Sequence, residues 1–304
     1  MGGYGQLTRK TSSVFSKNIM KRRFKTEADI DRHIKEGFGL GDGSSYKPWI
    51  RVQDISSVGR SRKTPGFKSG RLHHTLSDLE YYYLLLLEFS DEVVDIREQY
   101  PLFATPRARD LAAEMGIRYP NYLGTQLPLV ITSDFALTIQ VPDGKTRPAI
   151  RTCKYESELT DPQKGPRIIE KLELERAIWA EHGVTDWKIV TDRLMEPILK
   201  DNLQWLHGSA WVESNMATEE QKMQFIEAAV HTADGIRTLA SVVRSISNSV
   251  DLPYSNGTSL FKYLVWNKFL LTDLSATRLS LTLPCPVLRR GTAVQPDVIR
   301  REVA

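Results

Sequence analysis

The chain has 304 residues, a formal net charge of +4, and hydrophobic and charged shares of 41% and 26%. This length favours two domains with a sizeable core, and the composition is typical of a soluble globular protein. A net charge this small does not by itself indicate a nucleic-acid partner. The Tyr/Leu run over 81–87 is too short to cross a bilayer, so we expect no membrane span.

The two cysteines, Cys153 and Cys285, stand far apart and neither belongs to a CxxC pair. They therefore indicate neither a zinc knuckle nor a disulfide framework, which fits a reducing cytoplasm.

The first 26 residues contain seven Lys or Arg residues and no acid. They lack the apolar core of a signal peptide, so we expect residues 1–26 to form a basic, disordered arm. An organellar transit peptide is the alternative, because such peptides are also basic and rich in serine.

A helix is expected over 27–35, followed by the glycine-rich stretch GFGLGDGSS. This stretch predicts a turn and no nucleotide cradle, since no strand precedes it and no GK[ST] follows. The next loop, SSVGRSRKTPGFKSGRLHH, is basic and predicts phosphate contacts. The candidate DNA-binding residues are Arg60, Arg62, Lys63, Lys68, Arg71, His73 and His74.

An α/β core is expected next. A helix starting near Ser77 leads into a buried strand, VVDIREQYPL. Two antiparallel strands, LPLVITSDFALTIQV and PAIRTCKYE, turn at Asp143 and Gly144, which is a strong hairpin signal. A helix over 166–182 and the strand WKIVT complete this part.

The last third predicts helices over 218–231, 235–247 and 259–266. A hairpin of FLLTDL and RLSLTL, turning at SAT, should follow them. Three helices and a hairpin in this order match a winged helix, so we expect an α/β domain over 27–210 and a winged-helix domain over 211–284. The tail, 285–304, is expected to be extended or disordered.

Three residues have the spacing of a magnesium nuclease site. Phosphodiester hydrolysis needs an activated water and compensation of the phosphate charge, and magnesium held by one or two carboxylates supplies both. The PD-(D/E)XK arrangement places an acid on a helix, an acid near the head of one strand and acid-x-Lys on the next, because residues two apart on a strand face the same way. Glu80, Asp134 and Lys154 fit, with Thr152 in place of the second acid.

Each of these residues also has a structural alternative. Ser77 and Glu80 form a capping box, in which the glutamate satisfies a backbone N–H. Asp134 could simply end a turn, and Lys154 could be a solvated strand residue. Two adjacent histidines, His73 and His74, point differently on any regular element and make a poor joint metal site.

Several long motifs resemble the TnsA family, the endonuclease subunit of heteromeric transposases. They are GRSRKTPGFKSGRLHHTLSDLE, VVDIREQYPL, TSDF, IEKLELERAIW and KIVTD, in the family's order. The resemblance implies a restriction-endonuclease-like (PD-(D/E)XK) core followed by the winged helix.

The resemblance also implies roles for individual residues. It places the family's catalytic acids on Glu80 and Asp134 and its lysine on Lys154. The third metal position, Gln or Glu in the family, falls on Thr152, whose hydroxyl and the neighbouring Cys153 carbonyl are neutral oxygen ligands.

Glu98 and Gln99 end a buried strand near the expected pocket. They would support the site, either within a structural hydrogen-bond network or by positioning substrate.

The function implied is magnesium-dependent cleavage, with manganese able to substitute, of the 5′ strand at transposon ends. The implied partners are the end DNA, a TnsB-type DDE transposase and a TnsC-type AAA+ ATPase. Two alternatives remain open: a DNA-binding scaffold that lost its metal through Thr152, and a winged-helix transcription regulator.

Overall fold

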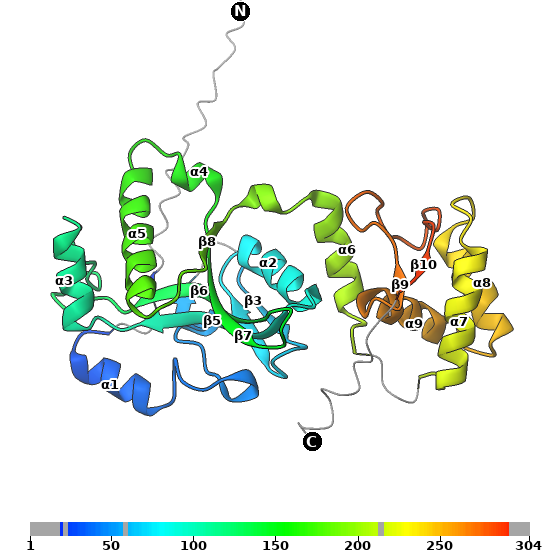
Figure 1. Ribbon diagram of the computed structural model, residues 1–304, viewed down its shortest axis with the longest axis horizontal. Helices are drawn as coiled ribbons and strands as arrows, with labels where there is room; N and C mark the ends of the chain where they lie inside the picture. Colours follow the sequence, from blue (N-terminus) through cyan, green and yellow to red (C-terminus); the bar gives the residue numbers. More distant parts are fainter. Residues whose placement is uncertain (1–18, 21–23, 57–59, 212–215, 292–304) are drawn as a thin grey trace, which may run out of the picture.

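The computed structural model describes residues 19–20, 24–56, 60–211 and 216–291, which form an α/β part and a mainly helical part (Figure 1). Within these residues, none of the helices combines the length and the apolar character that a membrane span requires.

The α/β part is built on a four-stranded sheet in the order β5-β6-β7-β8. Its strands are β5 (Val93–Leu102), β6 (Ile131–Gln140), β7 (Thr146–Cys153) and β8 (Trp187–Val190). The first three are antiparallel, and β8 runs parallel to β7. The β6–β7 hairpin turns at 141–145, where Gly144 has φ +81°, as the Asp-Gly signal predicted.

Helices cover both faces of this sheet (Figure 1). The helix α2 (Asp78–Phe89) packs on one face with Phe135 and Leu137, while α3 (Pro106–Glu114) and α5 (Gly165–Glu181) pack on the other with Ala136 and Ile150. Successive strand residues point to opposite faces, so each strand feeds both cores.

The α2 helix is apolar on nearly all sides because it is shared by two cores. Leu84 packs against the sheet, whereas Tyr81 and Leu85 pack with the C-terminal helices and with α6 (Pro197–His207). A helix that is hydrophobic all round is expected to be buried. The Tyr/Leu run therefore joins the two parts of the molecule.

The remaining elements of the α/β part lie around the sheet. They are β1 (Ile19–Met20), α1 (Glu27–Lys35), the 3₁₀ turns Gly43–Ser45 and Val52–Asp54, β2 (Ile55–Ser56), β3 (Arg62–Pro65), β4 (Leu72–Thr75), α4 (Glu156–Leu159) and the 3₁₀ turn Asp192–Leu194. β3 and β4 form an antiparallel hairpin within the predicted basic loop.

The expectation of a disordered arm over 1–26 is wrong where the structure describes this stretch. Ile19–Met20 pairs with β2, and Phe24 is buried beside Trp49 and Tyr122. Thr26 caps α1 through a reciprocal contact with Asp29. Burial of a large aromatic side chain is favourable, which explains the ordered position of Phe24. Residues 1–18 and 21–23 lie outside the described part.

The C-terminal part contains α7 (Glu219–Thr232), α8 (Leu239–Ser249), α9 (Tyr254–Trp266), β9 (Leu270–Leu271) and β10 (Arg289–Arg290). The three helices confirm the sequence prediction within a few residues. The hairpin prediction is only half right, because β9 pairs with β10 and not with 278–283.

The physical reason lies in Asn202 of α6, a buried polar residue. Its side chain donates to the carbonyls of Leu274 and Thr277, both at 2.8 Å, and accepts the Leu279 N–H at 2.7 Å. These bonds satisfy the backbone of 274–279 in an irregular loop, so a strand ladder is not needed there.

The tail was expected to be extended or disordered, and its described portion, 285–291, is extended chain that packs against the C-terminal part. Cys285 is fully buried and Leu288 nearly so, and Arg289–Arg290 forms β10. Residues 292–304 lie outside the described part.

Candidate active site

Glu80 lies in the first turn of α2, where its carboxylate makes the capping contacts that the sequence predicted. Ser77 caps the helix by accepting the Glu80 N–H, and its hydroxyl donates back to Glu80 Oε1 at 2.9 Å. The Leu76 N–H donates to Oε2 at 2.8 Å. The capping contacts thus aim a buried carboxylate, 7% exposed, towards the end of β6.

Asp134 lies where β6 and β7 part. The last residues paired between these strands are Phe135 and Arg151, and beyond them Asp134 Oδ2 accepts the Cys153 N–H at 2.7 Å. A carboxylate therefore replaces a backbone carbonyl in this position of the ladder. The splayed strands expose the Cys153 carbonyl to a side-chain partner, Lys154.

Lys154 completes the group. Its Nζ is 3.7 Å from Asp134 Oδ2 and donates to the Cys153 carbonyl at 2.8 Å. Burial lowers the pKa of Lys154, but the charges of Asp134, Glu175 and Glu80 outweigh it, and the net shift of the pKa is upward. The lysine is thus charged beside the two carboxylates.

Gln99 joins the two carboxylates. Its Nε2 is 3.3 Å from Glu80 Oε2 and 3.3 Å from Asp134 Oδ1. Its neighbours Glu98 and Tyr100 pair with Phe135 and Ser133, so Gln99 lies opposite Asp134 in the sheet.

The electrostatics of this group fit a divalent cation. Burial, and then the charge of Asp134, raise the pKa of Glu80 to about 8. Two buried carboxylates that repel one another are stabilised by a bound cation, and magnesium needs only one or two carboxylates together with neutral oxygens. The parts of the chain that the structure describes contain no group of three or more His, Cys, Asp or Glu residues arranged for a metal. Among the described residues, oxygens of uncharged groups also lie near these carboxylates, such as the Cys153 carbonyl and the Gln99 amide.

Thr152 is turned towards another partner. Its Oγ1 donates to Glu175 Oε1 at 2.6 Å, and the same oxygen accepts from Ser133 Oγ at 2.6 Å and from Trp187 Nε1 at 3.1 Å. Thr152 is 2% exposed. Its hydroxyl is therefore part of a buried polar network under the site.

Glu175 was not singled out from the sequence. Its pKa is raised, mainly by burial. A signal was present, because Glu175 lies three residues from both Leu172 and Ile178 and so on the apolar face of its helix. An acid in that position is unusual and calls for buried partners.

Two of the predicted DNA-binding residues belong to a buried network. Arg71 forms a two-pronged ion pair with Glu98, with N–O distances of 2.8 and 2.6 Å. His73 is fully buried, with Nδ1 2.7 Å from Glu98 and Nε2 3.5 Å from Glu88. These contacts bind the β3–β4 hairpin to β5 and α2, and they leave His73 no surface for a phosphate.

Glu98 accordingly belongs to the structural network and Gln99 to the carboxylate group, although they are adjacent. His74 is half-buried, and its ring nitrogen accepts the Val52 N–H at 3.2 Å. Lys68 donates to the Ser90 carbonyl at 2.6 Å.

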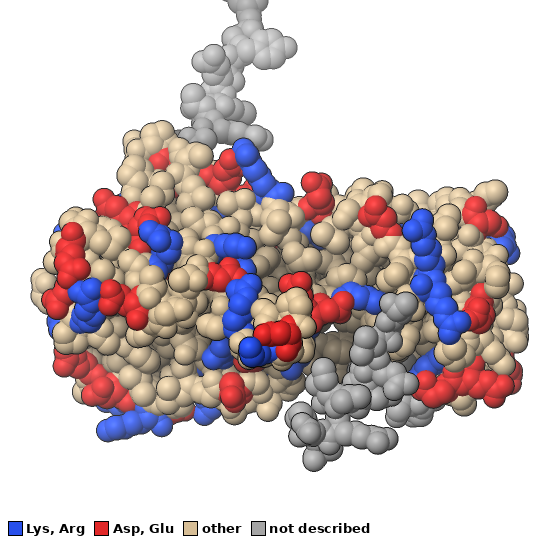
Figure 2. All heavy atoms as spheres, viewed as in Figure 1, with Lys and Arg blue, Asp and Glu red and all other residues tan. Residues whose placement is uncertain are grey.

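The remaining candidates stand closer to solvent. Arg60 and Lys63 are exposed, whereas Arg62 is half-buried, pairs with Asp78 at 2.7 Å and stacks over Tyr81. On the face shown in Figure 2, basic and acidic residues are interspersed over both parts of the molecule. This face therefore shows no continuous basic surface for DNA, and the exposed Arg60 and Lys63 of the β3–β4 region remain the candidates for phosphate contact.

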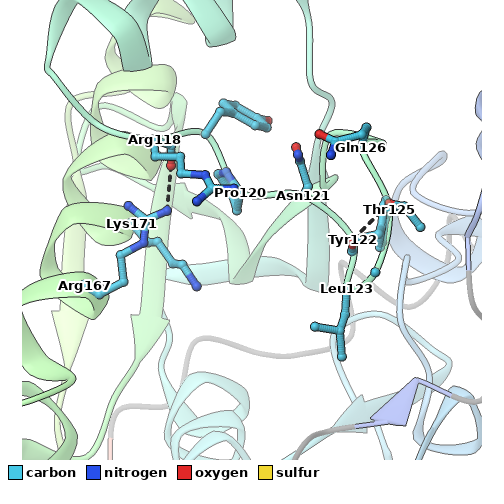
Figure 3. Close-up of a pocket in the computed structure, with 11 residues that line it drawn as sticks. Arg118, Pro120, Asn121, Tyr122, Leu123, Thr125, Gln126, Arg167 and Lys171 are labelled. Carbon is cyan, nitrogen blue, oxygen red and sulfur yellow. Dashed lines mark hydrogen bonds between the residues drawn. The ribbon is translucent and has the colours of Figure 1, made fainter.

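A basic pocket not singled out from the sequence lies between α5 and the loop 118–126 (Figure 3). Its volume is about 350 Å³, and Arg118, Arg167 and Lys171 line one side. Arg167 is held by Glu170 and by the Arg118 carbonyl. The pKa of Lys171 is lowered by burial and then by the charges of Arg167 and Lys154.

Two family models match the chain. One, described as "TnsA-like endonuclease N terminal", covers residues 90–192, and one described as "TnsA endonuclease C terminal" covers residues 196–274. The chain is also 34% identical over 246 residues to "Transposon Tn7 transposition protein TnsA" of Escherichia coli, a match spanning 81% of this chain and 85% of that protein. The chain belongs to the TnsA family of transposition endonucleases.

Proposed function

We propose that this protein is the magnesium-dependent endonuclease that cuts the 5′, non-transferred strand at the ends of a transposon. Support comes from the convergence of Glu80, Asp134 and Lys154 around the Gln99 amide, where β6 and β7 part. The core would be of the restriction-endonuclease type, and the C-terminal part a winged helix.

Each residue has a defined part in the proposed reaction. Glu80 and Asp134 hold magnesium, for which manganese can substitute, and the Cys153 carbonyl is a further oxygen nearby. When bound, the metal supplies an activated water and positive charge at the phosphate. Lys154 orients the nucleophile and offsets charge on the phosphate, as a charged amine 3.7 Å from Asp134 can do.

Family membership and the exposed basic residues support the proposed partners. A TnsB-type DDE transposase would cut the 3′ ends, and a TnsC-type AAA+ ATPase would contact the C-terminal part. The exposed Arg60 and Lys63 and the winged helix would supply phosphate contacts that carry no sequence information. The assembly would act in the bacterial cytoplasm, at the nucleoid.

The test is 5′ strand cleavage by the full chain, assembled with its partners on end DNA. Asp134→Ala should abolish cleavage, because it removes the carboxylate shared by the metal and by Lys154. Asp143→Ala is the matched control, since Asp143 is an exposed aspartate in the turn of the same hairpin. Unchanged cleavage by Asp134→Ala would refute the assignment.

A DNA-binding scaffold is the second candidate. It is favoured by one observation, the commitment of the Thr152 hydroxyl to Glu175. Calorimetric titration with manganese separates the two functions. The scaffold predicts no binding by the wild type and recovery of binding in Thr152→Glu, whereas the nuclease predicts binding by the wild type.

A further inference from the structure

The position of Gln99 in the sheet is unusual. Its φ is +49°, a left-handed conformation that residues other than glycine seldom adopt. The backbone on either side is anchored, because Tyr46 Oη donates to the Glu98 carbonyl at 3.0 Å and the Trp49 N–H to the Gln99 carbonyl at 3.2 Å. Such conformations persist where the surroundings enforce them, often at functional sites.

This backbone places the Gln99 amide between the two acids. Nε2 is 3.3 Å from an oxygen of Glu80 and 3.3 Å from an oxygen of Asp134. In this arrangement the amide hydrogens partly compensate the charge at the point where the carboxylates converge.

The amide can also present its oxygen to that point. Half a turn about its last bond exchanges Nε2 with Oε1, and the two atoms are equivalent in size. Oε1 now accepts from Thr132 Oγ1 at 3.4 Å, and a hydroxyl can equally accept from an amide. The turn therefore sacrifices no hydrogen bond to Thr132.

The spacing suits a magnesium shell. Oxygens bound at 2.0–2.1 Å in an octahedron lie about 3 Å from their neighbours. An amide oxygen in the present place of Nε2 would be 3.3 Å from an oxygen of each acid. Thr152 does not compete for this role, because its hydroxyl is bound to Glu175 at 2.6 Å.

We propose that Gln99 is a ligand of the magnesium site, its amide oxygen replacing the side-chain ligand that Thr152 does not provide. This inference rests on the proposed function. It assigns the third side-chain ligand to β5, whereas the acid-x-Lys pattern places it on β7.

The test is calorimetric titration of the full chain with Mn²⁺, without DNA. Gln99→Met keeps the length of the side chain and removes the amide, and it should weaken Mn²⁺ binding at least about tenfold. Gln99→Glu restores an oxygen ligand and should bind at least as tightly as the wild type. Gln140→Met, at the exposed far end of β6, is the matched control and should not change binding.

Thermal melting in EDTA verifies that each variant is folded. If Gln99→Met does not fold, the Mn²⁺ affinity of Gln99→Glu provides the test. Binding by Gln99→Met as tight as that of the wild type, or tighter, would overturn the inference, because the amide would then only fill the place of the cation. Much weaker binding by Gln99→Glu would overturn it as well.

The outcomes also separate this inference from the function on which it rests. Binding by the wild type that Asp134→Ala abolishes and Gln99→Met preserves would overturn the role of Gln99 alone. A wild type that binds no Mn²⁺ would overturn the metal-dependent function together with this inference.

Discussion

Two buried glutamates, Glu98 of β5 and Glu80 of α2, have opposite electrostatic surroundings. Glu98 is paired with Arg71 and His73, and these partners outweigh the effect of burial and lower its pKa to about 2. Glu80 is desolvated and faces Asp134, and its pKa rises to about 8. Both are held by several hydrogen bonds, so hydrogen bonding alone does not separate them.

The two glutamates differ in the positively charged side chains that contact them. The charge of Glu98 is compensated within the fold, which is typical of a structural ion pair. At Glu80 the main charge acting on the carboxylate is another carboxylate, which is typical of a functional site. The first glutamate holds the basic hairpin in place, and the second is available for chemistry.

Removing the charge of Glu80 should have the largest effect on function. Glu80→Gln keeps the shape and the capping contacts but should reduce 5′ strand cleavage about 1,000-fold or more, equivalent to about 4 kcal/mol of transition-state stabilisation. Cleavage of end DNA in the assembled complex measures this. Glu88→Gln, which changes a buried glutamate at the other end of α2, should leave Glu80 and Asp134 in place and serves as the control. Cleavage by Glu80→Gln at the wild-type rate would contradict the functional role assigned to Glu80.

Removing the charge of Glu98 should have the largest effect on stability. Glu98→Gln leaves Arg71 and His73 buried without their anion, which should lower the free energy of unfolding by about 3–5 kcal/mol. Urea denaturation measures this, with Glu92→Gln, an exposed residue just before β5, as the control. A loss no larger than that of the control would show that the ion pair is not structural.

The pH dependence of the metal-free protein should distinguish the two glutamates further. Because the folded pKa of Glu80 is raised, its contribution to stability is complete below its unfolded pKa near 4.5 and is lost as pH rises through about 8. The loss should be roughly 1 kcal/mol per pH unit within this window. The pH dependence from Glu98 has the opposite sign. Because its folded pKa is lowered, its contribution to stability is complete above the unfolded pKa of 4.5 and is lost as pH falls through about 2.

Urea midpoints of wild type and Glu80→Gln in EDTA between pH 5 and 8 test this. The raised pKa of His73, where Glu98 and Glu88 outweigh burial, also gives a loss as pH rises, but both proteins share it. The difference between the two curves isolates Glu80, and parallel curves would contradict its raised pKa.

The smallest effect is expected at the surface of the basic hairpin. Arg60→Ala and Lys63→Ala should each weaken DNA binding modestly and reduce the slope of log affinity against log salt by about 1 for each phosphate that the variant no longer neutralises. Fluorescence anisotropy at several salt concentrations measures this, with Lys145→Ala in the β6–β7 turn as the control. Unchanged slopes would place the phosphate-binding residues elsewhere.

Local patterns were sufficient to predict most of the elements and to select Glu80, Asp134 and Lys154 as candidates that lie together in the fold. The apolar period of α5, the alternation of β6 and β7 and the Asp143-Gly144 turn depend on neighbours in the chain, so they can be read directly. Glu80 and Asp134 could be proposed because their spacing follows from helix capping and strand geometry.

Only the tertiary structure decided the parts that depend on contacts between distant segments. Gln99 meets Glu80 and Asp134 across 19 and 35 residues, and Thr152 meets Glu175 across 23. The burial of His73, the capture of 274–279 by Asn202 and the pairing of β10 with β9 arise in the same way. The sequence by itself determined which residues could carry the chemistry. Packing determined which of them are hydrogen-bonded away and which face one another, because a polar group's partner depends on the fold around it.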